Sequence, residues 1–514
     1  MSAPGPTADP RRETPSWTAL ASGVAAGLLT VGTATLLAGL LERAGLSGGQ
    51  PAPVAAVGAA FIDRTPAWLK DLAISTFGVN DKRALLVGTV VVLAVVCALI
   101  GLLSRRRLTL ALILFAATAG VGLLGVLTRP GATAVDAVPT LVGAAVGLWF
   151  LARLSARGSA PDANPTRRLL LGGAVGGVAA YLGAVLGGGA ATAADSRQSA
   201  AKTSLDVERM SVPAGADLRV PGAAPYVVAN ADFYRIDTAL VVPRLDATQW
   251  RLRVTGMVDR EVEIDWATLQ GKPMREALVT LTCVSNEVGG DLIGNAVWTG
   301  WPVRELLAMA GPQAGADMVL QTSADGWTCG TPLTALTDDR NALLAIRMNG
   351  EPLPFEHGFP VRLVVPGLYG YVSATKWVSE LKVTTFAKDQ GYWTPRGWSA
   401  KGPIKTASRI DVPRVGATVP AGRVAVAGVA WAQHRGIRKV EVQVDDGPWQ
   451  QARLAEEPTI DAWRQWVLPW DATRGSHTIR VRATDGLGEL QTSVEAPPAP
   501  DGASGWHTIT VRVD

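Results

Sequence analysis

The chain has 514 residues, of which 48% are hydrophobic and 18% are charged, and its formal net charge is +4. It is too long for one domain, and its mean hydropathy of +0.20 is too high for a purely soluble protein. No basic cluster is interleaved with aromatic residues, so nucleic acid is not an expected partner. The three cysteines are too few for a disulfide framework, although a single disulfide between Cys283 and Cys329 stays an alternative.

The first 194 residues contain apolar runs that are each long enough to cross a bilayer, which takes about 20 residues. Five such runs lie near 17–41, 84–103, 108–128, 135–152 and 169–190, and none has a charge at its centre. The stretch 52–80 is interrupted by charges and a proline, so it is predicted to be an interfacial loop or an amphipathic segment. Ionisable groups inside a membrane mark transport pathways, and these spans have none at their centres, so they are predicted to serve as a membrane anchor or a docking surface. All four histidines lie downstream, so no bis-histidine haem is expected in the bilayer.

Arginines in the short connections predict the orientation of this anchor. They precede the first run, separate the second from the third, and separate the fourth from the fifth: Arg11, Arg12, Arg105, Arg106, Arg107, Arg153, Arg157, Arg167 and Arg168. With five spans all of them fall on one side, which the positive-inside rule identifies as cytoplasmic. Everything after residue 190 is then predicted to lie outside the cytoplasm.

The pair Arg167 and Arg168 directly precedes a glycine-rich and only moderately apolar run. This arrangement resembles a twin-arginine (Tat) signal, the export route for proteins that are already folded. The alternative is that both arginines are ordinary positive flanks of a membrane span.

After a polar linker at about 195–225, the sequence predicts two further domains. Residues 226–405 mix alternating strands such as "WRLRVTGMV" with a short helix, "PVRELLAMAG", that stops at Gly311. Residues 406–514 lose the helical pattern and show closely spaced alternating strands, with a hairpin turn at "DDG", 445–447. This region is therefore predicted to be an immunoglobulin-like β-sandwich.

Chemistry concentrates in two segments of the middle domain. Cys283 follows the strand "ALVTLT" and opens a polar, glycine-rich turn, which would expose its thiol at a strand end; the alternative is a buried structural cysteine. The segment 349–378 places His357, Arg362 and Lys376 among glycines and turns, as a phosphate-bearing ligand requires. A thiolate beside an anion-binding loop indicates a cofactor with a phosphate tail and a soft-ligand metal.

The motifs "TLTCVSN", "GNAVWTG", "NGEPLP", "HGFPVRLVVPGLYG" and "SATKW" follow one another in this domain. With them, the chain from about 230 to 510 resembles the sulfite oxidase family of molybdenum-cofactor (molybdopterin) enzymes, most closely its membrane-anchored bacterial type. The resemblance implies an α+β molybdopterin-binding domain at 226–405, and 406–514 is similar to the family's C-terminal dimerisation domain. The first 195 residues lie outside the resemblance to soluble members.

The resemblance also implies roles for individual residues. Cys283 matches the cysteine whose thiolate ligates molybdenum, and is thus both the catalytic and the metal-binding residue. The pterin and its phosphate would be bound by His357 and Arg362 and by the loop that closes on the phosphate. The full set of implied cofactor-binding residues is Asp232, Phe233, Tyr234, Thr322, His357, Arg362, Ser373, Ala374, Thr375 and Lys376.

One departure from the family bears on the substrate. Sulfite-oxidising members carry an arginine shortly after the cysteine, whereas this chain has Glu287, whose carboxylate would repel a dianion. Sulfite is therefore in doubt as the substrate. Cys329 lies in a segment that usually approaches the same pocket, and is interpreted as an inert small residue or as a second thiol near the metal.

The resulting expectation is a multi-pass cell-membrane oxidoreductase whose catalytic domain lies on the extracytoplasmic side. It would catalyse oxygen-atom transfer or a related two-electron reaction on a small molecule. No haem-attachment or iron–sulfur motif is present, so an external cytochrome or quinone-linked carrier would exchange the electrons. Two alternatives stay open: a methionine-sulfoxide-type reductase of exported proteins, and a non-catalytic membrane receptor or adhesin that retains the fold. A homodimer through the C-terminal domain is also implied.

Overall fold

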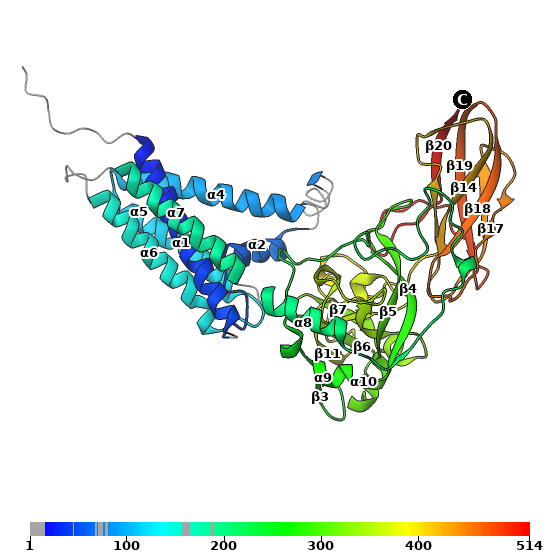
Figure 1. Cartoon of the computed structure of the whole chain (residues 1–514), viewed down its shortest axis with the longest axis horizontal. Coiled ribbons are helices and arrows are strands. Elements are labelled where there is room, and N and C mark those ends of the chain that lie inside the picture. Colours follow the sequence, from blue (N-terminus) through cyan, green and yellow to red (C-terminus); the bar gives the residue numbers. More distant parts are fainter. Residues whose placement is uncertain are drawn as a thin grey trace, which may run out of the picture. The chain divides into compact units, whose positions relative to one another are not determined.

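The computed structural model describes residues 16–44, 46–66, 69, 76–77, 81–156, 165–186 and 190–514. The chain forms two units: Met1–Ala191 with Thr238–Val242, and Thr192–Asp237 with Pro243–Asp514. Long helices build the first unit, and strand-rich domains build the second (Figure 1).

The first unit consists of long helices joined by short connections. Its helices are α1 (Ser16–Arg43), α2 (Pro53–Arg64), α4 (Asp81–Ser104), α5 (Leu108–Leu127), α6 (Val138–Ala156) and α7 (Pro165–Leu186). By length and composition, four stretches among the described residues could cross a membrane: Trp17–Arg43, Ala84–Ser104, Leu108–Leu127 and Ala134–Ser155. Four of the five predicted runs are therefore candidate spans by this measure. The fifth predicted run falls in α7 and extends into residues 187–189, which lie outside the described part of the chain.

Glycines let α1 approach its neighbours closely. A Cβ on Gly176 of α7 would lie 2.6 Å from the Leu28 carbonyl oxygen, and one on Gly183 would clash with the backbone at Thr35. Such small residues allow helix backbones to touch, as is typical of helix packing in membranes. Since Leu28 faces Gly176 and Thr35 faces Gly183, α1 and α7 run in the same direction.

Two mixed sheets form the core of the catalytic domain. One has the order β1-β4-β5-β8-β10, with β9 paired to β8, and the other has the order β3-β2-β11-β6-β7. The first contains β1 (Val207–Glu208), β4 (Met274–Thr282), β5 (Ile293–Pro302), β8 (Leu343–Met348), β9 (Glu351–Pro352) and β10 (Arg362–Val364). The second contains β2 (Arg251–Gly256), β3 (Val262–Asp265), β6 (Met318–Ser323), β7 (Thr328–Pro332) and β11 (Val378–Thr384).

Short helices connect these strands: α9 (Trp266–Gln270), α10 (Val303–Ala310) and α11 (Leu333–Thr337). The helix predicted from "PVRELLAMAG" is α10, and it ends at Gly311, which is left-handed with φ +70. The strand predicted from "WRLRVTGMV" is β2, and its alternating burial fits the alternating sequence pattern. Both predictions are confirmed.

The segment 195–225, predicted as a linker, differs from the expectation. It contains the second half of α8 (Ala190–Lys202) and strand β1, which pairs in parallel with β4. Arg197 donates hydrogen bonds to the carbonyls of Leu353 and Pro352 at 2.8 and 2.9 Å. The polar composition of this segment therefore reflects side chains that bind the backbone of the catalytic domain, so the segment is part of that unit.

The C-terminal region is a sandwich of two sheets around one shared core. One sheet contains β12 (Ala407–Val412), β14 (Gly422–Trp431), β17 (Arg453–Leu454) and β18 (Arg464–Ala472). The other contains β13 (Thr418–Val419), β15 (Ile437–Val444), β16 (Gln450–Gln451), β19 (Gly475–Asp485) and β20 (His507–Val513). The predicted hairpin at 445–447 joins β15 to β16 and is confirmed. The classification of the C-terminal region as immunoglobulin-like stays a prediction.

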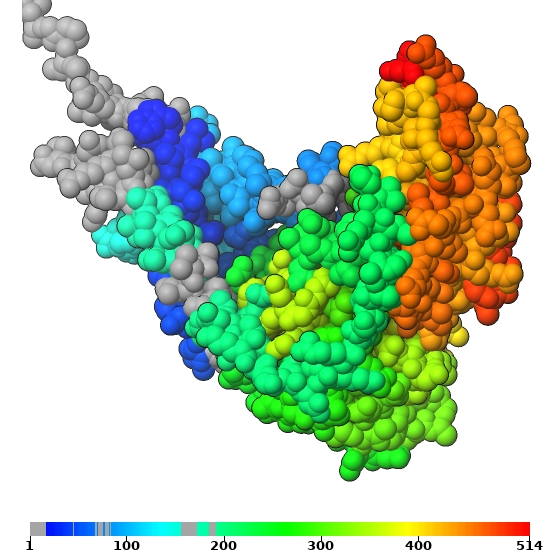
Figure 2. All heavy atoms as spheres, turned by 45° about the vertical axis from the view of Figure 1, so that its right-hand side comes forward, coloured from blue at the N-terminus to red at the C-terminus, as the bar shows by residue number. Residues whose placement is uncertain are grey.

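The β-sandwich and the catalytic domain pack directly against each other (Figure 2). The contact centres on the end of β4, where Thr280 N–H donates to the Asp461 carbonyl at 3.0 Å. The Gln433 amide donates to the Thr280 carbonyl and the Thr282 hydroxyl at 3.1 and 3.0 Å. Further along, Arg409 donates to the carbonyl of Gly290 at 2.8 Å. The β-sandwich therefore holds the strand that leads to Cys283.

Gly289 provides a test of this contact, because it has φ +78 and a Cβ there would clash with the His507 ring. We expect Gly289→Ala to lower the free energy of unfolding for two reasons. The strained backbone conformation costs about 1–3 kcal/mol, and the clash with His507 costs about as much again. Gly315 is a matched control, since it has φ +88 but nothing lies within 4 Å of its Cβ position. Unfolding midpoints of the two alanine variants measure the difference, and equal losses would contradict the contact.

Candidate active site

Cys283 begins the turn 283–292 that joins β4 to β5, as predicted. The ends of the turn are closed by a hydrogen bond from Cys283 N–H to the Leu292 carbonyl at 2.9 Å. Asn286 holds its middle, because its side-chain oxygen accepts from Leu292 N–H at 2.8 Å. The turn is therefore fixed by its own hydrogen bonds as well as by the β-sandwich.

The thiol of Cys283 is buried, with 9% of the residue exposed, so the expectation of an exposed thiol is wrong. This burial arises from tertiary packing. The loop that contains η6 (Gly370–Val372) covers the end of β4, and a Cβ on Gly370 would lie 3.8 Å from the Thr282 carbonyl oxygen. Burial raises the pKa of Cys283, while hydrogen bonds from Ser285 and the charge of Lys376 oppose the shift.

Arg362, the first residue of β10, is a buried guanidinium without a carboxylate partner among the described residues; the residue is 4% exposed. Its hydrogen bonds go to the backbone carbonyls of His357, Leu363 and Ala374, at 3.1, 3.3 and 3.4 Å. Its charge also lies over the ring of Trp298, 5.0 Å from the centroid. Burial lowers the pKa of Arg362 to about 10.

Lys376 adds a second buried cation to the same site. Its ammonium donates to the Glu356 carbonyl at 2.8 Å and pairs with Asp237 at 3.0 Å. Burial lowers the pKa of Lys376 to about 8; Asp237 opposes this shift, and the neighbouring Arg362 adds to it. Asp237 also pairs with Arg235 at 3.0 Å. One carboxylate thus serves two cations, and the site keeps an excess of positive charge.

Gly358 brings the two cations together. It has φ +111 and follows η5 (Phe355–His357), and a Cβ at this position would lie 3.0 Å from Arg362 Cβ and 3.1 Å from Lys376 Cβ. A side chain would force the cationic residues apart, so the glycine of "HGFPVR" is required by both its conformation and the close packing.

His357 is buried between the cations and an aromatic cluster. Its ring lies edge-to-face with Phe233 at 5.5 Å between centroids, and Nε2 lies 3.1 Å from the Asn230 carbonyl oxygen. Burial first, and then the charges of Lys376 and Arg362, lower the pKa of His357 to about 3. The imidazole is therefore neutral at physiological pH, and its contact with a carbonyl makes Nε2 the protonated nitrogen.

Tyr234 links the thiol to the cations. It stacks on Phe233 with 5.2 Å between ring centroids. Burial raises the pKa of its hydroxyl, with Cys283 adding to the shift and Arg362 opposing it, so both groups lie within electrostatic reach. The structure therefore brings together six residues of the predicted set: Cys283, Tyr234, Phe233, His357, Arg362 and Lys376.

The loop residues Ser373 and Thr375 are fully buried, and Ala374 accepts one of the Arg362 hydrogen bonds. Thr322 lies near the end of β6, where its carbonyl accepts from Ser379 at 3.1 Å. Asp232 is exposed, and its described hydrogen bond joins its N–H to the Ala229 carbonyl, so the structure does not bring its side chain to the cluster.

Cys329 lies on β7, and its sulfur is 3.2 Å from the Thr375 hydroxyl. Burial raises the pKa of Cys329 to about 12, which keeps the thiol protonated. Cys283 and Cys329 are both free thiols, so the disulfide considered from the sequence is not formed.

Sequence reasoning missed Asp237, Trp298 and Tyr369. Asp237 ends the motif "NADFYRID", and its position three residues after Tyr234 could have identified it as the counter-ion of a nearby cation. Trp298 lies in "GNAVWTG", but nothing local indicates that its ring would face Arg362. Tyr369 lies in "GLYG", and only the fold brings it close to the Cys283 turn.

These side chains fit a phosphate-bearing cofactor that brings its own metal ligands. Among the described residues, no group of three or more His, Cys, Asp or Glu side chains could hold a metal ion. One buried thiol can supply a single soft ligand, so a metal here needs further ligands from a cofactor. A guanidinium buried without a carboxylate needs an anion to offset its desolvation, as a phosphate would.

Comparisons with known proteins agree with this donor set. Residues 239–393 match the family described as the oxidoreductase molybdopterin binding domain. The mitochondrial sulfite oxidase of Homo sapiens is 30% identical over 340 residues, which cover 56% of this chain and 62% of that protein. YuiH, an uncharacterized oxidoreductase of Bacillus subtilis, is 34% identical over 157 residues, which cover 30% of this chain and 76% of that protein.

Among solved structures, the sulfane dehydrogenase SoxCD from Paracoccus pantotrophus aligns with a TM-score of 0.49 and 22% identity, over 61% of this chain and 89% of that chain. The curated relatives are longer than the matched region, which spans about 62% of the human protein. The matched family domain and the identity to YuiH and to sulfite oxidases lead to one conclusion. The chain belongs to the sulfite oxidase family of molybdopterin-dependent oxidoreductases.

Proposed function

We propose that this protein is a membrane-anchored molybdopterin oxidoreductase that carries out oxygen-atom transfer, or a related two-electron reaction, on a small molecule. One observation carries the proposal: a buried thiol lies in a single site with a buried guanidinium that has no carboxylate partner among the described residues. When bound, the cofactor supplies a molybdenum centre that exchanges an oxygen atom and two electrons.

The chain's own residues would bind and orient that cofactor. Cys283 would ligate the metal, and Arg362 and Lys376 would bind the phosphate with the loop 373–376. His357 would remain neutral and accept a hydrogen bond from the pterin at Nδ1, because its Nε2–H is directed at the Asn230 carbonyl and its pKa of about 3 prevents it from adding charge to an already cationic site. Asp232 and Thr322 are proposed as cofactor contacts on the resemblance alone.

The thiol's burial supports its role as a ligand. A protein environment with few waters strengthens each charge–charge interaction inside it. The pKa of the free thiol is raised by burial, so binding of a cation is what would favour its deprotonated form. The same burial keeps water away from the reacting centre.

We further propose that the first unit anchors the protein in the cell membrane and that α7 is a fifth crossing. Its close glycine contacts with α1 support this, because α1 is itself a candidate span. Since α1 and α7 run in the same direction, a cytoplasmic start of α1 implies an extracytoplasmic end of α7. The catalytic domain would then face the extracytoplasmic side, as the sequence predicted.

Electrons would pass to or from an external cytochrome or quinone-linked carrier, because the proposed reaction releases or consumes two at a time. A homodimer through the β-sandwich is proposed because residues 406–514 resemble the family's C-terminal dimerisation domain. The three-part architecture therefore combines an anchor, a cofactor domain and a docking domain.

The Cys283→Ser variant tests the function directly. We expect turnover to be abolished while pterin stays bound, because a serine hydroxyl is a harder and weaker donor than a thiolate. Pterin fluorescence after denaturation and turnover with an artificial electron carrier are measured on the same preparation. Normal turnover in this variant would refute the role of Cys283.

The Arg362→Ala variant tests the phosphate end. Loss of one charge-assisted bond of roughly 1.5–3 kcal/mol should weaken cofactor binding about 10- to 150-fold. Molybdenum and pterin content are measured after purification, and Arg482→Ala on the β-sandwich is the control. The cofactor-free variant should remain folded, since the substitution removes a buried charge. Full occupancy would contradict the assignment.

The pKa of Lys376, about 8, predicts that cofactor retention depends on pH. In the free site this ammonium loses its proton above pH 8, whereas a bound phosphate favours the protonated form. Affinity should therefore fall as pH rises from about 7 to 9.5, by up to one decade per pH unit. Lys376→Arg keeps its charge and should remove this fall. Retention after dialysis at each pH is the measurement, and identical profiles would exclude Lys376 from phosphate binding.

The Arg167→Lys, Arg168→Lys double variant tests export of a folded domain. It preserves the charge that positive-inside topology requires and removes only the twin-arginine pattern. We expect the catalytic domain to stay inside, which protease accessibility of residues 200–514 in spheroplasts would measure. If the double variant still displays its domain outside, both arginines are ordinary flanks.

A further inference from the structure

A cleft opens beside the Cys283 turn and is shared by the catalytic domain and the β-sandwich. Its walls come from the turn itself, from Tyr369, and from four segments of the C-terminal region. The lining consists of Thr282, Asn286, Glu287, Val288, Gly289, Tyr369, Thr406, Ala407, Ser408, Trp431, Gln491, Ala503, Ser504 and Gly505. More than half of the lining residues thus come from a domain that supplies none of the predicted cofactor-binding residues.

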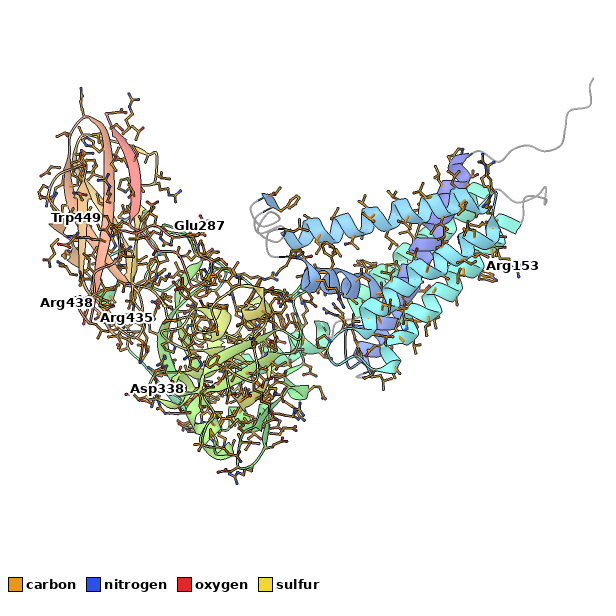
Figure 3. All side chains as sticks on the ribbon, turned by 180° about the vertical axis from the view of Figure 1, so that it is seen from behind. Arg153, Glu287, Asp338, Arg435, Arg438 and Trp449 are labelled. Carbon is orange, nitrogen blue, oxygen red and sulfur yellow. The ribbon has the colours of Figure 1, made fainter. Side chains whose placement is uncertain are left out.

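Among the residues that the structure describes, Glu287 is the one charged side chain in this lining. Glu287 is exposed on the turn and lies on the catalytic domain beside the β-sandwich (Figure 3). The cations of the site, Arg362 and Lys376, are buried and are not part of the lining. The phosphate end of the site is therefore cationic, whereas the solvent-facing cleft carries a carboxylate.

The cleft lies on the sulfur side of the site. Two lining residues lie near Cys283 in the sequence: Thr282 precedes it at the end of β4, and Asn286 follows it by three residues in the turn. Tyr369 also lines the cleft, and the pKa of its hydroxyl, raised mainly by burial, includes a contribution from Cys283. Tyr369 also packs against the C-terminal region, where a Cβ on Gly502 would meet the Tyr369 ring and hydroxyl. A molecule in this cleft would be beside the turn that carries Cys283.

We propose that substrate reaches the metal through this cleft, and that Glu287 selects small uncharged or cationic solutes over anions. The proposal rests on the function proposed above and specifies its substrate class. The polar lining provides hydroxyl and amide groups for a neutral oxygen-bearing solute, and no cation in the lining would offset the charge of an anion.

The size of the effect follows from electrostatics in a solvated cleft. A carboxylate about 7 Å from a substrate charge changes binding by roughly three- to sevenfold per unit charge, and salt reduces the effect. A cation and an anion of equal size should therefore differ by about tenfold or more. Replacing Glu287 by glutamine should remove this difference without altering the shape of the cleft.

The first arm of the test measures the charge preference without any turnover. Ala503→Cys places a thiol in the cleft wall of the loaded full-length protein, where all three native cysteines are buried. Its labelling rates are compared for a trimethylammonium-ethyl and a sulfonatoethyl methanethiosulfonate, relative to free cysteine. We expect the cationic reagent to be favoured by about tenfold, and Glu287→Gln to abolish that preference. Glu263→Gln, on an exposed face of β3, is the matched control and should leave the preference intact.

The second arm tests the entrance. Turnover of sulfite, dimethyl sulfoxide and trimethylamine N-oxide is measured before and after the Ala503→Cys thiol is fully labelled with a bulky reagent. Labelling should block every substrate that is turned over, whereas labelling of Asp446→Cys on the β15–β16 hairpin should block none. In Glu287→Gln, kcat/KM for sulfite should rise at least threefold while that for dimethyl sulfoxide stays unchanged.

Each outcome has a distinct meaning. Turnover that survives complete labelling overturns the entrance and leaves the proposed function intact. Absence of turnover with all three substrates before labelling refutes the proposed function, and the labelling ratio then decides the charge selectivity of the cleft. A ratio that does not depend on Glu287 overturns the selectivity.

Discussion

The structure of the candidate active site depends on a guanidinium that is buried without a carboxylate partner in the described part of the chain. Removing an ion from water costs several kcal/mol, and backbone carbonyls offset only part of this for Arg362. The surrounding residues follow from that constraint: Trp298 offers its ring face, His357 stays neutral, and Gly358 allows Lys376 to approach. Such a site is complete only when it holds an anion, and a phosphate-bearing cofactor supplies one. The thiol of Cys283 lies at the other end of the same site.

The β-sandwich supplies none of the predicted cofactor-binding residues, but it fixes the position of the strand and turn that carry Cys283. It holds the end of β4 by hydrogen bonds to Thr280 and Thr282, and it supports the turn at Gly289 and Gly290. Because the thiol follows directly after this strand, the location of Cys283 is determined by both domains. The shared cleft has the same origin: the turn that carries Cys283 also forms one wall of the contact with the β-sandwich.

Local patterns predicted the parts of the structure that local physics controls. The strand before Cys283, the helix end at Gly311 and the hairpin at 445–447 follow from side-chain alternation and turn residues. The motifs also predicted that His357, Arg362 and Lys376 belong to one site. The buried state of Cys283 could not be predicted, because a loop about 90 residues later in the sequence covers it. The polar segment 195–225 was predicted as a linker, because its sequence alone does not show that its side chains bind backbone groups far away in the chain.

The central claim is that Cys283 ligates the metal of a cofactor whose phosphate is bound by Arg362 and Lys376. X-ray absorption at the molybdenum edge of the purified, loaded protein tests it most directly. Cys329→Ser is the matched control, because Cys329 is the other buried thiol of this domain. The account predicts that Cys283→Ser removes one sulfur neighbour from the metal and that Cys329→Ser removes none. An unchanged sulfur count in Cys283→Ser, or a loss in Cys329→Ser, would contradict it.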